Sequence, residues 1–278
     1  MRRSVTTALS VTTTAGRAQH AFMLAAARVP GLEVADRFDA RLSGAPVTVV
    51  PVPTRHHGVM HLVDLPADTP DGGDLSVVYT ADVLGDPVAA AEAAESEVTA
   101  GELLEYLRPS RYAESDRLSA VARSELGTLA GFELALAVTD WVRQRLAYVP
   151  GSSRHTDGAV ETILARTGVC RDFAHVVVAL LRALDVPSRI ASVYAPGLSP
   201  MDFHAVAEAW VDGHWHVLDA TGMAPRPSLV RIATGRDAAD IAFLSSYGAP
   251  VWLRQLEVTC VVEDRLPADD GAVPVRMP

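Results

Sequence analysis

Cys170 is the first residue of this sequence that could do covalent chemistry. It directly precedes the apolar run 173–184, and that run predicts a buried helix that begins at the cysteine. The N-terminus of a helix carries unpaired N–H groups and a partial positive charge, which favour the thiolate form of a cysteine. The same N–H groups can hold the oxyanion formed when a carbonyl is attacked. Cys170 is therefore predicted to be an activated nucleophile for amide or thioester carbonyls, with Arg171 adding positive potential.

A nucleophile of this kind needs a base, and a predicted hairpin supplies one. Asp212-Gly213 is a strong two-residue hairpin turn. If it forms the loop, Val206 faces Asp219 on the neighbouring strand, and His204 lies on the same face as Val206. The turn therefore places His204 one diagonal step from Asp219, where a carboxylate can orient an imidazole. A register shift of one residue would separate the two side chains, so this prediction depends on the turn.

The elements that must position these residues fall into two groups. Up to about residue 84, short β-like runs alternate with turns, which predicts a small sandwich or barrel. The alanine-rich run 20–28 fits a strand or a helix. Helical spacing follows in four segments, 115–126, 134–146, 158–167 and 170–184. Four strands are expected after them, at 189–194, 205–211, 214–220 and 252–262. Helices followed by an antiparallel sheet indicate an α+β fold.

Wider motifs surround the ordered set Cys170, His204 and Asp219. The segments 167–189, 201–205 and 215–221 resemble the cysteine, histidine and aspartate motifs of bacterial transglutaminase-like proteins, a superfamily that includes transglutaminase-like cysteine proteases. Segments 106–112 and 231–241 are similar to one bacterial branch of that superfamily. The resemblance covers most of the chain, and it is strong from about Tyr106 to Gly248.

The resemblance implies a papain-like core, in which the cysteine helix packs on an antiparallel sheet, and a catalytic triad of Cys170, His204 and Asp219. A small all-β domain of the bacterial transglutaminase type is expected before that core. We therefore divide the chain into a β-sandwich-like domain, a linker, a transglutaminase-like catalytic domain and a polar tail, over residues 1–95, 96–114, 115–262 and 263–278.

The composition of the chain limits the classes of binding partner that we expect. The chain has 278 residues, a formal net charge of −10 and no lysine. This charge argues against binding to nucleic acid or to an anionic membrane surface. No apolar run approaches the roughly 20 residues of a membrane span. The N-terminal segment reads as a β-strand rather than a signal peptide, so a cytoplasmic protein is expected. The sequence leaves the oligomeric state open.

Several residues have a plainer interpretation than catalysis. Cys260 lies in an apolar strand and reads as a structural cysteine. Asp172 is expected to cap the cysteine helix or to hold a nearby loop, and His175 to be a hydrogen-bonded core residue. The remaining histidine groups lack matching ligands nearby in sequence, so neither a metal nor a cofactor is predicted; they are His56, His57, His61, His214 and His216.

The leading hypothesis is a cysteine hydrolase that cleaves amides of peptides or proteins through an acyl-enzyme on Cys170. Transfer of the acyl group to an amine, or use of an acyl-thioester substrate, is the alternative, because the outcome depends on how well the site excludes water. A non-catalytic binding module is a third interpretation, and recruitment of a partner by the β domain a fourth. The sequence does not identify a second donor to the oxyanion. Trp141, Tyr148 and Tyr194 are candidates, and each is equally well explained as a core residue.

Overall fold

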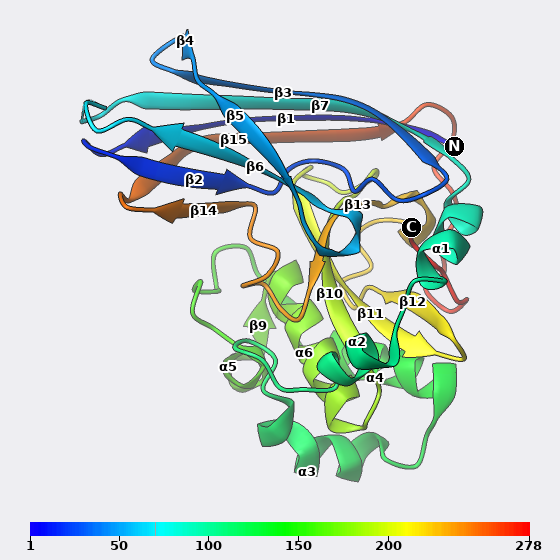
Figure 1. Ribbon diagram of the computed structural model, residues 1–278. Coiled ribbons are helices and arrows are strands. Elements are labelled where there is room, and N and C mark those ends of the chain that lie inside the picture. Colours follow the sequence, from blue (N-terminus) through cyan, green and yellow to red (C-terminus); the bar gives the residue numbers. More distant parts are fainter. Residues whose placement is uncertain (70) are drawn as a thin grey trace.

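The N-terminal part of the chain forms β-strands, as its alternating pattern predicts. In the computed structural model, which describes residues 1–69 and 71–278, every second side chain of the first strand is buried, from Arg3 to Thr13. This strand lies inside a five-stranded sheet at the top of Figure 1. The strand order of that sheet is β15 (Val251–Val262), β1 (Arg2–Thr13), β7 (Asp74–Gly85), β3 (Leu32–Leu42) and β4 (Ala45–Pro46).

A second antiparallel sheet packs beneath the first (Figure 1). Its order is β14 (Leu244–Tyr247), β2 (Ala18–Phe22), β6 (Val59–Leu65) and β5 (Val49–Pro53), and the short 3-10 helix η1 (Arg55–His57) joins β5 to β6. The run 20–28 begins as strand β2 and then leaves regular structure. Ala25 to Ala27 follow this strand and are buried in the core. Alanine is compatible with a helix or a strand, so the sequence of this run left its structure open.

Helices make up most of the lower half of the molecule (Figure 1). Their bounds are α1 (Pro87–Glu95), α2 (Ala100–Glu105), α3 (Ser115–Leu126), α4 (Gly131–Arg145), α5 (Ala159–Ala165) and α6 (Cys170–Ala183), and two short parallel strands, β8 (Ala147–Tyr148) and β9 (Thr167–Gly168), frame α5. All four helices expected between 115 and 184 are present. Helix α6 begins at Cys170, as predicted, and nearly all of its side chains are buried.

The sheet beside α6 has the predicted hairpin. Its order is β12 (His214–Leu218), β11 (Phe203–Val211), β10 (Ser188–Tyr194) and β13 (Val230–Gly235). The short 3-10 helix η2 (Arg226–Ser228) lies between β12 and β13 in the sequence. Trp210 pairs with Trp215 across the turn. Asp212 and Gly213 both have positive φ, 53° and 83°, which the tight turn requires. The small side chains of Ala207 and Ala209 share one buried cluster with α6, so the helix approaches the sheet closely.

The fold is α+β, as expected, but the domain limits differ from the sequence estimate. Strands β14 and β15 fall within the range 115–262 expected for the catalytic domain, yet they pair with β2 and β1. The reason is that β1 would otherwise be an exposed sheet edge, and β15 covers it. The expected linker 96–114 contains α2 and Tyr106, which is 1% exposed.

The C-terminal segment also has a fixed place. Val275 and Met277 are buried, and Val217 on β12 donates its N–H to the carbonyl of Val275 at 2.8 Å. The polar tail expected over 263–278 therefore returns to the sheet of the helical half. Within residues 1–69 and 71–278, no helix has the length and apolar character needed to cross a membrane.

Candidate active site

The start of helix α6 is built around its cysteine. Cys170 is the first residue of the helix and is partly exposed. Asp172, which is fully buried, accepts a hydrogen bond from the N–H of Val169 at 2.9 Å, so its expected capping role is confirmed. A side chain at position 168 would bring its Cβ within 2.8 Å of the Cβ of Asp172. Gly168 is therefore needed for the close approach that holds Cys170 at the helix end.

Arg171 contributes differently from the sequence expectation. Its guanidinium donates to Asp172 at 2.9 Å, to the hydroxyl of Ser153 at 2.5 Å and to the carbonyl of Arg154 at 2.8 Å. Its charge is therefore paired with the buried Asp172, and the residue ties the loop before α5 to the start of α6. This pairing, together with the bond from Val169, satisfies the buried carboxylate of Asp172.

His204 and Asp219 meet as the hairpin predicts. Nε2 of His204 and Oδ2 of Asp219 are 2.9 Å apart, and the two residues are only 2% and 6% exposed. The other carboxylate oxygen of Asp219 accepts from the N–H of Thr221 at 2.8 Å and from its hydroxyl at 2.6 Å. These bonds fix the carboxylate, which in turn fixes the imidazole ring. Because Nε2 is occupied by Asp219, Nδ1 is the nitrogen left for Cys170.

The electrostatics of this group favour a charged imidazole. Burial alone disfavours the imidazolium, but hydrogen bonds to Asp219 and then to Cys170 outweigh it and raise the pKa of His204 to about 10. Burial would likewise raise the pKa of Asp219, whereas its bonds to His204 and Thr221 lower it below its ordinary value. The arrangement can therefore hold an imidazolium beside the sulfur of Cys170, with a carboxylate behind it.

Among the three residues considered as a second oxyanion donor, only Tyr148 lies at the cysteine. Burial and then the sulfur of Cys170 raise the pKa of its phenol, and its ring lies 6.1 Å from that of Phe173. Trp141 instead donates to Glu125 at 3.1 Å. Tyr194 is buried and donates to the carbonyl of Leu24 at 2.6 Å.

Residues of the β domain reach the same region, which sequence reasoning missed. Phe203, next to His204, stacks on Phe243 with ring centroids 5.3 Å apart. Phe243 is held by a bond from the N–H of Met23 to its carbonyl at 3.0 Å. These side chains and Cys170 border one apolar cluster. A local motif gives no signal for such contacts, because Phe203 and Phe243 lie in separate elements of the sequence and Met23 belongs to the distant N-terminal part.

His175 is a hydrogen-bonded core residue, as predicted. Its Nε2 accepts the N–H of Ala238 at 3.1 Å, and burial lowers its pKa to about 4. Its ring stacks on Tyr112 at 5.3 Å, while the N–H of Tyr112 donates to Asp237 at 3.0 Å. The two outlying family-like segments, 106–112 and 231–241, therefore meet on helix α6 and support it.

The remaining histidines lie in different surroundings. His56 is hydrogen-bonded to the hydroxyl of Tyr106 at 2.6 Å, and His214 to the carboxylate of Glu95 at 2.8 Å. The ring of His61 stacks on that of Phe38, with 4.1 Å between the ring centroids. Among the residues that the structure describes, no three His, Cys, Asp or Glu side chains are grouped to hold a metal ion. Cys260 is buried and free, consistent with a structural cysteine.

Comparison with known proteins adds to this geometry. Residues 116–220 match the model of the transglutaminase-like superfamily. The crystal structure of a candidate cysteine protease from Cytophaga hutchinsonii has a TM-score of 0.85 and 29% identity, and the match covers 100% of this chain and 98% of that one. An uncharacterised protein of Mycobacterium leprae is 26% identical over 151 residues, 50% of this chain and 53% of its own length, so the chain spans about half of that relative. Residues 116–220 are therefore similar in sequence to the transglutaminase-like superfamily, and the whole chain is similar in fold to the Cytophaga structure.

Proposed function

We propose that the protein is a cysteine-dependent amide hydrolase of the peptidase type, with Cys170 as nucleophile, His204 as base and Asp219 as the group that orients it. The observation that carries the proposal is the placement of His204, which is bonded through Nε2 to a buried carboxylate and lies close enough to the thiol at the helix start for Cys170 to raise its pKa. A nucleophile, a base and an orienting acid in this order are the parts that covalent acyl chemistry needs.

The proposed reaction follows from these contacts. His204 holds the proton of the thiol, and the Cys170 sulfur attacks the carbonyl carbon of the substrate. The C–N bond then breaks, and the imidazolium gives its proton to the leaving amine. Water, deprotonated by His204, attacks the thioester, and the acid leaves as the thiol re-forms. The N–H groups at the start of α6 and the Tyr148 hydroxyl are the proposed donors to the oxyanion.

Hydrolysis is favoured over acyl transfer by one feature of the site. Cys170 is partly exposed, so water can reach an acyl group on its sulfur. Transfer to an amine, or from an acyl-thioester, uses the same nucleophile and remains the second candidate. The two are separated by assaying quenched peptide substrates with and without added primary amine. The chain itself contains no lysine, so it cannot act as its own lysine acceptor in that assay. A cytoplasmic location stays part of the proposal.

The nucleophile is tested by alkylation with iodoacetamide. At pH 6 we expect Cys170 of the wild type to react about tenfold faster, or more, than in His204→Ala, because the imidazolium that stabilises the thiolate is missing there. Mass spectrometry of the Cys170 peptide follows the reaction, and buried Cys260 serves as the internal control. Equal rates in both proteins over pH 5 to 9 would contradict the activated nucleophile and favour a non-catalytic binding module.

A further inference from the structure

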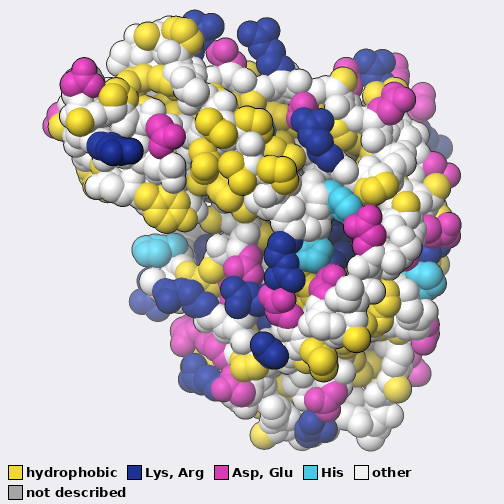
Figure 2. Space-filling model, viewed as in Figure 1, with side chains coloured by type: hydrophobic (Ala, Val, Ile, Leu, Met, Phe, Trp, Pro, Cys, Tyr) yellow, Lys and Arg dark blue, Asp and Glu magenta, His cyan; other side chains and the backbone are white. Residues whose placement is uncertain are grey.

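A cavity lies where the β domain meets the helical half of the molecule. Its volume is about 810 Å³, within the range of small-molecule sites. The wall on the β side comes from β5 and η1, and the opposite wall comes from α1 and from the sheet of the helical half. Figure 2 shows arginine, acidic and histidine side chains gathered at this junction. Neither Cys170, His204 nor Asp219 lines the cavity, so it is separate from the site described above.

The floor of the cavity is a buried charge network. Arg189 and Arg231 both donate to Glu208, at 2.8 and 2.7 Å, and all three side chains are nearly inaccessible to solvent. Burial would raise the pKa of Glu208, but the two guanidinium groups lower it to about 2. Charges buried at this depth are costly unless they are paired and well bonded. This network therefore holds Arg189 and Arg231, which line the cavity, in fixed positions.

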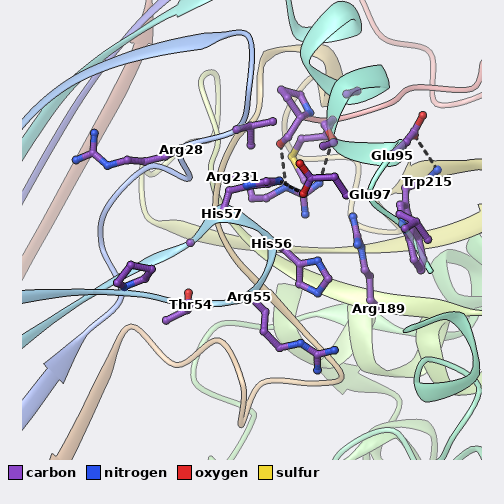
Figure 3. Close-up of a pocket in the computed structure, with 18 of the residues that line it drawn as sticks. Arg28, Thr54, Arg55, His56, His57, Glu95, Glu97, Arg189, Trp215 and Arg231 are labelled. Carbon is purple, nitrogen blue, oxygen red and sulfur yellow. Dashed lines mark hydrogen bonds and ion pairs between the residues drawn. The ribbon is translucent and has the colours of Figure 1, made fainter. Parts of the chain in front are cut away.

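Two donors of this floor lack protein partners. The indole N–H of Trp215, a residue that is 2% exposed and lines the cavity, has no acceptor in the described structure. Arg189 uses Nε for Glu208 and Nη1 for Glu102, whereas its Nη2 has no hydrogen bond to any described residue. Arg189 covers the ring of Trp215 at 3.9 Å, and Figure 3 shows it between His56 and Trp215. An unsatisfied buried donor costs about 1–3 kcal/mol, so an acceptor at this point would be stabilising.

The same cavity already accepts oxygen atoms of a peptide main chain. Arg231 donates to the carbonyl oxygens of Met277 and Pro278, at 3.0 and 2.8 Å, and both of these residues line the cavity. The unpartnered donors belong to Arg189 and Trp215, which line the same cavity. Part of the remaining wall is apolar, with prolines, valines and alanines of β5, β6 and α1, and the other part carries charged side chains, among them Arg28, Arg55, Glu95, Glu97 and Glu102. The cavity therefore presents donors for main-chain oxygens next to an apolar part of its wall.

We propose that this cavity is a second binding site, which takes a short peptide with small apolar side chains and holds an oxygen of that peptide on Arg189 and Trp215. The oxygen belongs to a terminal carboxylate or to a main-chain carbonyl. His56 does not supply a charge at neutral pH, since burial and then Arg189 lower its pKa to about 3. Binding here does not require Cys170, so the site can be tested independently of the proposed hydrolase activity.

The test uses ¹⁵N-labelled Cys170→Ala protein, titrated with N-acetyl-alanyl-proline as free acid and as amide. The chain has four tryptophans, and the indole signal of Trp215 is assigned by its loss in Trp215→Phe. We expect the Trp215 signal to shift on titration, while that of half-exposed Trp252 stays in place. Tighter binding of the free acid would assign the oxygen to a carboxylate, and equal binding to a carbonyl.

The matched control is Trp210→Phe, because Trp210 packs against Trp215 in the same strand pair but does not line the cavity. Trp215→Phe should weaken binding about tenfold, and Trp210→Phe less than twofold. If Trp215→Phe fails to fold, Arg189→Lys replaces it and should weaken binding similarly, because a lysine lacks the planar fork. An unmoved Trp215 signal, or equal affinity in the variants, would overturn the proposal.

Discussion

At the residue scale, the proposed reaction depends on the imidazole side chain of His204. Its Nε2 is bonded to a buried carboxylate, and both this carboxylate and the thiol of Cys170 raise its pKa. Thr221 adds two hydrogen bonds to Asp219, so the carboxylate cannot easily turn away from the ring. Orientation is therefore built in three layers, from Thr221 through Asp219 to His204, and each layer is buried or half-buried.

Asp219→Asn tests this chain of orientation. We expect the fold to persist and kcat/KM on a cleaved peptide to fall by about three to four orders of magnitude, because the neutral amide neither stabilises the imidazolium nor fixes its tautomer. Asp212→Asn is the control, since Asp212 lies in the hairpin turn, where asparagine also tolerates positive φ. Activity of Asp219→Asn within a few-fold of the wild type would contradict the assigned role of Asp219.

The raised pKa of His204 also predicts how stability depends on pH. A group whose pKa is higher in the folded state contributes stability that is complete below its ordinary value of 6.5 and is lost as the pH rises toward about 10. The free energy of unfolding should therefore fall more between pH 6.5 and 10 in the wild type than in His204→Gln. Urea titrations at several pH values measure this difference, and parallel pH profiles would exclude it.

At the scale of elements, the start of α6 decides whether Cys170 is in place. The β8–β9 pair brings Tyr148 and Gly168 together, and the helix then begins within two residues. Asp172 caps the helix from inside, and Arg171 pairs with it. The hairpin of β11 and β12 brings His204 and Asp219 to the same place from the other side.

Asp172→Ala should lower the free energy of unfolding by about 1–3 kcal/mol, because the N–H of Val169 loses its acceptor and Arg171 loses its partner in a buried place. Asp116→Ala is a suitable control, since Asp116 occupies the first turn of α3 but is exposed. Denaturant unfolding measures both variants. Equal stability of the two would show that the cap is not important for the fold.

At the scale of the whole molecule, the β domain and the helical half share one core. A single apolar cluster contains Val5 and Leu75 from the β sheets together with Ala174 and Ile190 from α6 and β10. Tyr194 adds hydrogen bonds across the same boundary, to Thr7 at 2.9 Å and to the carbonyl of Leu24. The β domain is therefore a structural part of the region around the candidate active site.

This shared core predicts one cooperative unfolding transition. Far-ultraviolet circular dichroism, which reports on all elements, and tryptophan fluorescence should give coincident denaturation curves. Trp252 lies in the upper sheet and the other three tryptophans in the helical half, so the fluorescence of a Trp252→Phe variant isolates that half. Two separate midpoints would show that the halves are independent.

The sequence by itself determined the features that depend on near neighbours. Apolar periodicity gave the helices and most strands, the Asp212-Gly213 turn set the hairpin register, and register placed His204 beside Asp219. Each of these follows from backbone geometry over a few residues, so it can be worked out by counting along the chain.

Only the tertiary structure decided what joins distant segments. Strand β15 pairs with β1, although the two strands lie near opposite ends of the sequence. Phe243 stacks on Phe203, which is next to the catalytic candidate His204. The cavity over Arg189 and Trp215 likewise needs walls from both halves of the molecule. Such contacts carry no sequence period, because they arise from the free energy of burying whole faces against each other. Local pattern therefore fixed the candidate triad, while packing fixed its surroundings.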